Sequence, residues 1–409
     1  MTTQRQFIAS GALLCLLAAS PPQGETGPQW FKGNTHTHTL WSDGNAAPEH
    51  VADWYVKHGY DFLVLSDHNI LSQGQRWMAV SESADGRLRT VDVESLEARF
   101  GPGWVVERRG SDGREMKLKT LAELREKFEG DDFIFIQGEE ITDRYEDHEI
   151  HVNGLNLDTV IPPQGGDSIV ETIQRNIDAV IAQGKRLNRP VLAHLNHPNY
   201  KRSLRPEHIA AIEGERFFEV YNGHRGTRGH GDIMTDATEQ IWDVALTIRL
   251  VEHDLGLLYG LATDDAHDHH GNGRVSVPGR GWVWVRSDRL TADAIIDAMR
   301  AGDFYASTGV RLADFGADGR RLWLQIVPQP GVTYTTEFIG TRLVNGAPAF
   351  SGQLLATSQD LRPSYRMTGD ELYVRARVIS SRLHPNPFAE GDLETAWVQP
   401  VLGPAGLRH

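Results

Sequence analysis

The chain has 409 residues, of which 40% are hydrophobic and 23% are charged, and its formal net charge is -14. This length is sufficient for more than one domain, at roughly 150 residues per domain, and the composition is that of a soluble globular protein. No basic stripe dominates any segment, so we expect no nucleic acid as the main partner. A small anionic substrate stays possible, because a few local cations suffice to bind a phosphate group.

The first twenty residues have the pattern of a secretory signal peptide. Arg5 precedes an apolar run over residues 7–19 that is too short to span a bilayer, and small residues follow at 18–20. The only cysteine, Cys15, lies in this segment, so any metal in the mature chain must be held by His, Asp and Glu. We predict signal peptide 1–20, export to the periplasm or the medium, and no stable membrane insertion after cleavage. An uncleaved N-terminal anchor is the alternative.

The first chemically distinctive stretch is 34–44, which is typical of a strand end followed by a turn. His36 and His38 are two residues apart, so a strand places both imidazoles on one side, and Asp43 follows in the turn. Neutral imidazole and carboxylate oxygen are usual ligands of divalent transition metals. Taken alone, the stretch is equally typical of two solvated histidines in a Thr-rich strand.

Helices then alternate with short buried strands, which is the α/β pattern. A helix is predicted over 48–58 and a strand over 62–65, and the strand ends in Asp67 and His68. Residues 71–131 are polar, contain several glycines and have a single predicted helix near their end. We interpret them as an insertion at the active-site end, or alternatively as a flap without catalytic contact.

Further strands are predicted at 133–136, 190–193, 217–221 and 256–262, with helices over 168–187, 241–251 and 291–301. Potential ligands follow these strands or lie near them: Glu140, His151, His194, His197, His224, Asp265 and His267. In a barrel of parallel strands the C-terminal strand ends meet on one face, so we expect one shared site. Each histidine taken singly is as well explained by a structural role.

Beyond about Arg311 the pattern changes to period-2 alternation with turns, without a strong helical period. We predict a C-terminal all-β domain over 311–409 that is structural or forms a wall of the substrate cleft. Arg375 and Arg377 share one face of a predicted strand and are expected to be solvated.

The motifs together resemble the PHP family, the polymerase and histidinol phosphatase superfamily of metal-dependent hydrolases. The matching residues occur in the family's order between about 30 and 310: His36-Thr-His38 with Asp43-Gly44, Asp67-His68, Gly138-x-Glu140, His197-Pro198 and Asp265-x-His267. The insertion and the ending at 302–309 look closer to the carbaryl-hydrolase-like branch. The resemblance implies a distorted βα (TIM-like) barrel with two to three divalent metal ions, and the family uses Mn, Zn and Fe.

The resemblance also implies a ligand set for each ion. The first ion would be held by His36, His38, Glu140 and Asp265. Glu140 would bridge to a second ion, held also by His151 and by His197 or His194, of which the proline-adjacent His197 is preferred. The third ion would be held by Asp43, His68 and His267. Asp67 is expected to orient His68 or a metal-bound water.

These parts imply hydrolysis by a metal-bridging hydroxide that attacks phosphorus or a carbonyl carbon. Asp265 is the expected proton acceptor, while His224, Arg225 and Lys201 could bind a phosphate or protonate a leaving group. Alternatively, Lys201 and Arg225 are ordinary surface residues of loops without a role in substrate binding. We predict an exported phosphoesterase with a small phosphate ester as substrate. A carbamate, ester or amide hydrolase is the alternative, followed by a non-catalytic metal-stabilised binding module. The pattern leaves the oligomeric state open.

Overall fold

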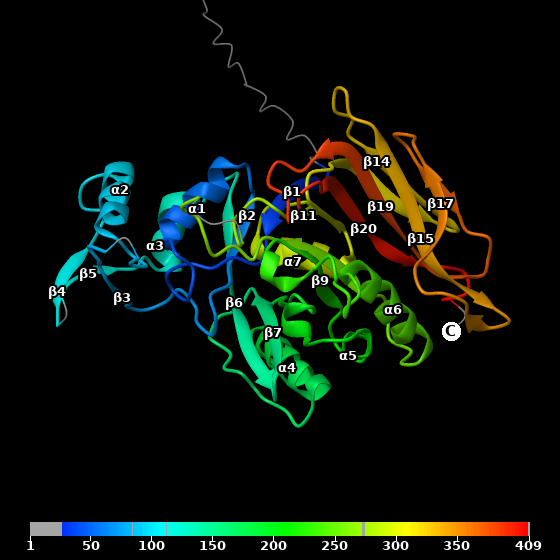
Figure 1. Cartoon of the computed structure of the whole chain (residues 1–409), viewed down its shortest axis with the longest axis horizontal. Helices are drawn as coiled ribbons and strands as arrows, with labels where there is room; N and C mark the ends of the chain where they lie inside the picture. The colour runs from blue at the N-terminus through cyan, green and yellow to red at the C-terminus, as the bar shows by residue number, and fades with distance from the viewer. Residues whose placement is uncertain (1–26, 84, 112, 272–274, 408–409) are drawn as a thin grey trace, which may run out of the picture.

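The structure is a computed structural model that describes residues 27–83, 85–111, 113–271 and 275–407, so the predicted signal peptide lies outside the described residues. Its main element is a mixed sheet of 14 strands in the order β10-β9-β8-β7-β6-β2-β1-β11-β12-β20-β19-β15-β16, with β17 beside β15. The 71–131 segment lies at one end of the molecule and the C-terminal strands at the other (Figure 1). None of the helices in the described ranges combines the length and apolar character needed to cross a bilayer.

The central part of the molecule contains the alternating strands and helices that the sequence predicts, together with strand β7 and helix α5, which it does not predict. Its strands are β1 (Gln29–Asn34), β2 (Phe62–Leu65), β6 (Ile134–Tyr145), β7 (His148–Leu155), β8 (Leu192–Leu195), β9 (Phe217–Asn222), β10 (Tyr259–Thr263), β11 (Trp282–Ser287) and β12 (Phe304–Ser307). Its helices are α1 (Pro48–Lys57), α4 (Ile169–Leu187), the short α5 (Pro206–Ala210), α6 (Thr238–Val251) and α7 (Ala292–Ala301), with 3-10 turns η1 (Tyr200–Arg202) and η2 (Arg225–Thr227).

Helix α4 shows how local sequence sets these elements. The Ser168 side chain accepts a hydrogen bond from the backbone N–H of Glu171 and so caps the first turn. Ile173, Ile177 and Val180 recur at helical spacing and are all buried against the sheet. The helix ends at Asn188, which adopts the left-handed conformation common after a last turn.

The strand directions differ from the predicted parallel barrel. The β1–β2, β2–β6, β8–β9 and β9–β10 pairs are parallel, but β6–β7 and β7–β8 are antiparallel. The reason is the tight turn between β6 and β7, which is too short for the crossover that a parallel pair needs. One parallel bridge, Thr37 to Ala266, joins the segments after β1 and β10. No regular ladder closes a TIM-like barrel among the described residues.

The 71–131 segment has more regular structure than the single helix predicted. It contains β3 (Trp77–Ala79), α2 (Thr90–Phe100), β4 (Glu107–Gly110), β5 (Gly113–Lys117) and α3 (Leu121–Phe128), with sheet order β3-β5-β4. Helix α3 is the predicted one, and Thr120 and Glu123 form its capping box. Helix α2 escaped prediction because only two of its side chains, Val93 and Leu96, are buried, which gives a weak helical period.

The described residues after Arg311 form strands and no helix: β13 (Leu312–Asp318), β14 (Arg321–Ile326), β15 (Tyr334–Val344), β16 (Ala347–Pro348), β17 (Gln353–Ser358), β18 (Ser364–Arg366), β19 (Glu371–Leu383) and β20 (Leu393–Leu402). Strand β20 pairs with β12, so these strands continue the central sheet.

The expectation that Arg375 is solvated is wrong. Arg375 is 1% exposed, and its guanidinium donates two hydrogen bonds, of 2.8 and 2.6 Å, to the carboxylate of Asp243 in α6. Arg377 is half-buried and is paired with Glu239 and Glu337. Because α6 is more than a hundred residues away in sequence, the period-2 pattern of the strand could not indicate these partners.

Candidate metal centre

Four side chains from different parts of the fold bring one donor atom each to a common point, and we call them the first donor group: His36, His38, Glu140 and Asp265. His36 Nε2 lies 3.1 Å from His38 Nε2, and 3.3 Å from both Glu140 Oε2 and Asp265 Oδ1. His38 Nε2 lies 3.3 and 3.1 Å from the same two oxygens. A tetrahedral ion with ligands at about 2.0–2.1 Å separates its ligands by about 3.3 Å, so this group fits a divalent transition metal.

The backbone explains this convergence. Thr37 lies between His36 and His38 and points to the other side. The backbone N–H of Thr37 donates to Ser66 Oγ, and the backbone N–H of His38 donates to Ala266 O. Asp265 N donates to His36 O, and Asp265 itself has a φ of 48°, in the left-handed region. The segments after β1 and β10 are therefore fixed side by side, with their ligands on one side.

Glu219, in the middle of β9, supports this group and escaped the sequence analysis. Its Oε1 accepts hydrogen bonds from His36 Nδ1 at 2.6 Å and from Thr263 Oγ1 at 2.9 Å. Its Oε2 accepts from the backbone N–H of His197 and from Asn222 Nδ2, both at 2.8 Å. A proton on Nδ1 of His36 leaves the Nε2 lone pair facing the other donors, as in carboxylate-oriented metal histidines. A glutamate inside an otherwise apolar buried run is the signal that could have identified it.

The second donor group is Glu140, His151 and His197. Glu140 Oε1 lies 2.9 Å from His151 Nδ1 and 3.2 Å from His197 Nε2, and it accepts a hydrogen bond from Asn196 Nδ2 at 2.8 Å. Its other oxygen, Oε2, faces His36 and His38 of the first group, lies 3.1 Å from His68 Nδ1, and is buried without a hydrogen bond to any described residue. A buried carboxylate oxygen among imidazole nitrogens fits a bound cation, because a cation compensates the hydration that the carboxylate loses on burial.

His194 lies near these groups but belongs to neither. Its ring is fully buried, and its Nδ1 is 4.0 Å from Glu219 Oε1. Burial lowers the pKa of His194 to about 4, so the ring is neutral at pH 7. The structure thus brings His197, rather than His194, within reach of Glu140.

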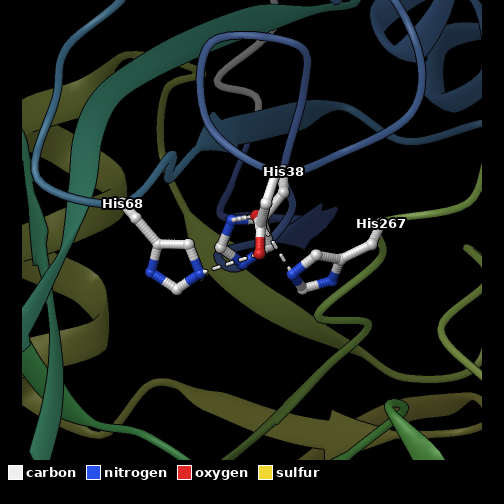
Figure 2. A group of neighbouring side chains, drawn as sticks. His38, His68 and His267 are labelled. Carbon is white, nitrogen blue, oxygen red and sulfur yellow. Dashed lines mark ion pairs between the residues drawn. The ribbon is translucent and has the colours of Figure 1, made fainter. Parts of the chain in front are cut away.

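The third donor group consists of Asp43, His68 and His267, and it adjoins His38. Asp43 Oδ1 lies 3.3 Å from His267 Nε2, and Asp43 Oδ2 lies 3.5 Å from His68 Nε2. Figure 2 shows the rings of His38, His68 and His267 gathered around one point, with the ion pairs as dashed lines. His38 separates the first and third groups, since its Nε2 faces the first and its Nδ1 lies 3.6 Å from Asp43 Oδ1.

The charge states of the cluster suit cation binding. Burial alone raises the pKa of a carboxyl, but the surrounding imidazoles hold the pKa values of Glu140 and Asp265 well below the usual range. Burial lowers the pKa of His38 to about 3, which keeps this ring neutral. Burial alone also lowers the pKa of His151, but Glu140 raises it to about 9. A metal ion would displace such protons, because only the neutral ring is a ligand.

Two acidic residues next to the cluster have other partners. Asp67 accepts hydrogen bonds from Thr39 N and Thr39 Oγ1, both at 2.8 Å, and from Ser42 Oγ at 2.6 Å. It therefore fixes the 39–42 loop, and its carboxylate bonds to this loop and not to His68; the alternative role, orienting a metal-bound water, stays a prediction. Glu139 points to the opposite side of β6, where its Oε1 accepts from the backbone N–H of Ile161 at 2.6 Å.

The three residues expected to contact substrate lie around the cluster. The His224 ring is 5.5 Å from that of His267 between centroids, and burial lowers the pKa of His224. Lys201 Nζ is 2.8 Å from Glu149 Oε1, and Glu149 Oε2 is in turn 3.6 Å from His151 Nε2. Arg225 donates through Nη2 to Pro387 O at 2.8 Å. Both cations therefore already have oxygen partners.

No protein-family model matches the chain. No curated protein matches it either.

Three solved structures resemble the fold at low identity. A two-domain protein from Bacteroides vulgatus, containing a predicted PHP-like metal-dependent phosphoesterase, is 16% identical, with 95% of this chain and 100% of that chain covered and a TM-score of 0.44. A putative metal-dependent phosphoesterase from Bifidobacterium adolescentis is 15% identical, with 66% and 94% covered and a TM-score of 0.30. An amidohydrolase from Chromobacterium violaceum with bound sulfate and no metal is 14% identical, with 60% and 89% covered and a TM-score of 0.30.

At these scores the likeness supports no conclusion about chemistry, and none of the three concerns the carbaryl-hydrolase-like branch. The chemical case rests on the donor groups.

Proposed function

We propose that the protein is a PHP-type metal-dependent hydrolase whose donor groups hold two to three divalent ions, Mn, Zn or Fe. The observation that supports this most directly is the bridging position of Glu140. Its two oxygens serve different groups, 3.3 Å from His36 and His38 on one side and 2.9 Å from His151 on the other. Adjacent ions that share a carboxylate are typical of hydrolytic sites in which bound metals activate water and polarise the substrate.

The chain's own groups would manage the protons. Asp265 directs Oδ1 toward the two histidines, while its Oδ2 accepts from Asn222 Nδ2 at 3.2 Å, so the carboxylate is held in one orientation. We assign Asp265 as the proton acceptor for the attacking water. The lowered pKa of His224 makes its ring neutral at pH 7, which suits a hydrogen bond to substrate better than proton donation to a leaving group.

The leading substrate class is a small phosphate ester, and carbamates, esters or amides are the second candidate. One observation favours the second candidate. Lys201 is paired with Glu149 and Arg225 Nη2 with Pro387 O, so a phosphate would have to share these two cations with oxygen partners they already have, although the buried Arg225 Nε has no such partner among the described residues. A screen of phosphate mono- and diesters beside aryl carbamates and esters decides between them.

The experiment that tests the proposal combines elemental analysis with turnover. Purified protein from metal-supplemented medium is expected to hold two to three ions per chain, and one ion or fewer would defeat the proposal. Asp265→Asn keeps a coordinating oxygen and is expected to lower turnover by about 100-fold or more, with a smaller loss of metal. Asp297→Asn, at an exposed site on α7, is the matched control and should change neither.

Near-parental turnover of Asp265→Asn at full metal occupancy would place the base elsewhere.

We also propose that the protein is exported, on the sequence of residues 1–20. N-terminal sequencing of protein from the periplasm or the medium tests this, and an intact Met1 on cytoplasmic protein would refute it.

A further inference from the structure

We infer that the inserted segment 71–131 positions Asp43 through Arg87, and thereby determines whether the third donor group binds its ion. The inference rests on the proposed function, because it concerns one of the proposed metal positions. It assigns a positioning role to a segment whose sequence predicts only an insertion or a flap. The evidence lies in the contacts between this segment and the loop that carries Asp43.

The loop is anchored in the core of the inserted segment. Leu40 and Trp41 are 0% and 2% exposed, and both belong to a cluster whose other members include Leu88, Val93 and Met116 of the insertion. Trp41 also donates through Nε1 to Lys119 O at 2.8 Å. Because the burial of two large apolar side chains in a shared cluster is favourable, the insertion and the loop form one packed unit.

Arg87 adds two hydrogen bonds to the part of the loop that the apolar core does not reach, beside those from Ser42 Oγ to Asp67 and from Asn45 N to His267 O. Its Nη2 donates to Ser42 O at 2.5 Å and to Gly44 O at 2.9 Å, which are the carbonyls on either side of Asp43. Hydrogen bonds from a charged donor are about twice as strong as neutral ones. Among the described residues these two carbonyls are the hydrogen-bond partners of the Arg87 side chain, so holding this loop is its visible role.

The loop is also folded tightly against a ligand of the first group. A Cβ atom on Gly44 would lie 2.6 and 2.7 Å from the backbone C and O of His38. Only glycine permits this approach. Gly44 is thus held against the His38 backbone, so the two Arg87 hydrogen bonds act on a turn that already lies close to the imidazoles.

Asp43 depends on this backbone support because its own side chain has little other contact. The side chain is 55% exposed, and its oxygens lie 3.3 to 3.6 Å from His267, His68 and His38, with Ser42 Oγ at 3.4 Å. It is the only carboxylate of the third group. The other donors of the first and second groups come from the segments after β1 and β10, from β6 and β7, and from the loop after β8, so losing Arg87 should leave those groups intact.

The test is metal stoichiometry and affinity of the full-length protein, measured by equilibrium dialysis against graded Mn²⁺ or Zn²⁺ followed by elemental analysis. Arg87→Ala is expected to weaken one ion by about 10–100-fold, the usual effect of losing a supporting contact, while the other ions keep their affinity. Arg87→Lys keeps a charged donor but loses the reach and the planar geometry of the guanidinium, and should fall between. Asp43→Ala should remove the same ion.

Arg99→Ala is the matched control, since Arg99 is also on the insertion but pairs with Asp53 of α1, and it should leave all ions unchanged. Unfolding midpoints show whether each variant is folded. If Arg87→Ala does not fold, the metal affinities of Arg87→Lys decide the test. Unchanged affinities in Arg87→Ala, or an equal loss of every ion, would overturn the inference. The inference would also be overturned if the wild-type protein bound two ions and Asp43→Ala still bound both of them. That outcome would not contradict the proposed function. Wild-type protein with one ion or fewer defeats the proposed function itself.

Discussion

Replacing Glu219 with glutamine is expected to weaken metal binding, although Glu219 belongs to none of the donor groups. All four of its hydrogen-bond partners, His36 Nδ1, Thr263 Oγ1, His197 N and Asn222 Nδ2, are donors. A glutamine amide has one oxygen and one NH₂ group. If its NH₂ group takes the place of Oε2, it faces the two N–H donors of His197 and Asn222. If it takes the place of Oε1, it is satisfied only when His36 accepts at Nδ1, which puts the ring proton on Nε2 and removes the lone pair that faces the other donors.

The size of the effect follows from these contacts. Hydrogen bonds to a charged group contribute about 1.5–3 kcal/mol each, but the folded protein loses them both with and without metal. Metal affinity changes only by the part of this free energy that acts through the orientation and basicity of the His36 ring. Loss of an orienting partner of a ligand typically costs about 10–100-fold in metal affinity, and we expect Glu219→Gln to fall in that range.

The assay is competition between the protein and a chromophoric chelator, with unfolding midpoints to confirm that the variant is folded. Glu139→Gln is the control, because Glu139 is equally buried but faces the other side of β6. Burial raises the pKa of Glu139 to about 7, so glutamine resembles its protonated form, and metal affinity should not change. Wild-type affinity in Glu219→Gln, or equal weakening in both variants, would refute the reasoning.

Two further predictions concern the choice of ligand and the stability of the fold. His197→Ala should lower metal content and activity together, while His194→Ala should be milder, because only His197 lies 3.2 Å from Glu140; the reverse ranking would contradict this. Burial raises the pKa of Glu215 from 4.5 to about 7, so the free energy of unfolding should fall as pH rises from about 4.5 to 7. Glu215→Gln should therefore stabilise the protein by up to about 3 kcal/mol at pH 8 and hardly at pH 4.5. Denaturant unfolding at both pH values measures this, and a pH-independent difference would argue against it.

Much of the site could be predicted because its residues follow local rules. His36 and His38 share a side because side chains alternate along a strand, and Asp265 follows an apolar run that forms a strand. Both patterns are complete within a few residues, so the sequence suffices to place them. The structure brings these residues to the same point, with donor atoms 3.1 to 3.3 Å apart.

The remainder depends on partners that are distant in sequence. Glu219 occupies an ordinary inward position of β9, and only the fold places it beside His36, 183 residues earlier. The antiparallel β6–β7 pair likewise depends on a turn whose tightness the apolar runs do not indicate. Arg375 was expected at the surface for the same reason, since the carboxylate that neutralises it lies in α6.

The pairing of β12 with β20 has a consequence for protein engineering. The composition of the chain suggests a cut near residue 311, yet a chain ended there would leave β12 with an open backbone edge, which invites aggregation. It would also leave Asp243 without Arg375, its bidentate partner at 2.6 and 2.8 Å. A graft of foreign strands onto this fold must therefore supply both a matching edge for β12 and a buried cation for α6.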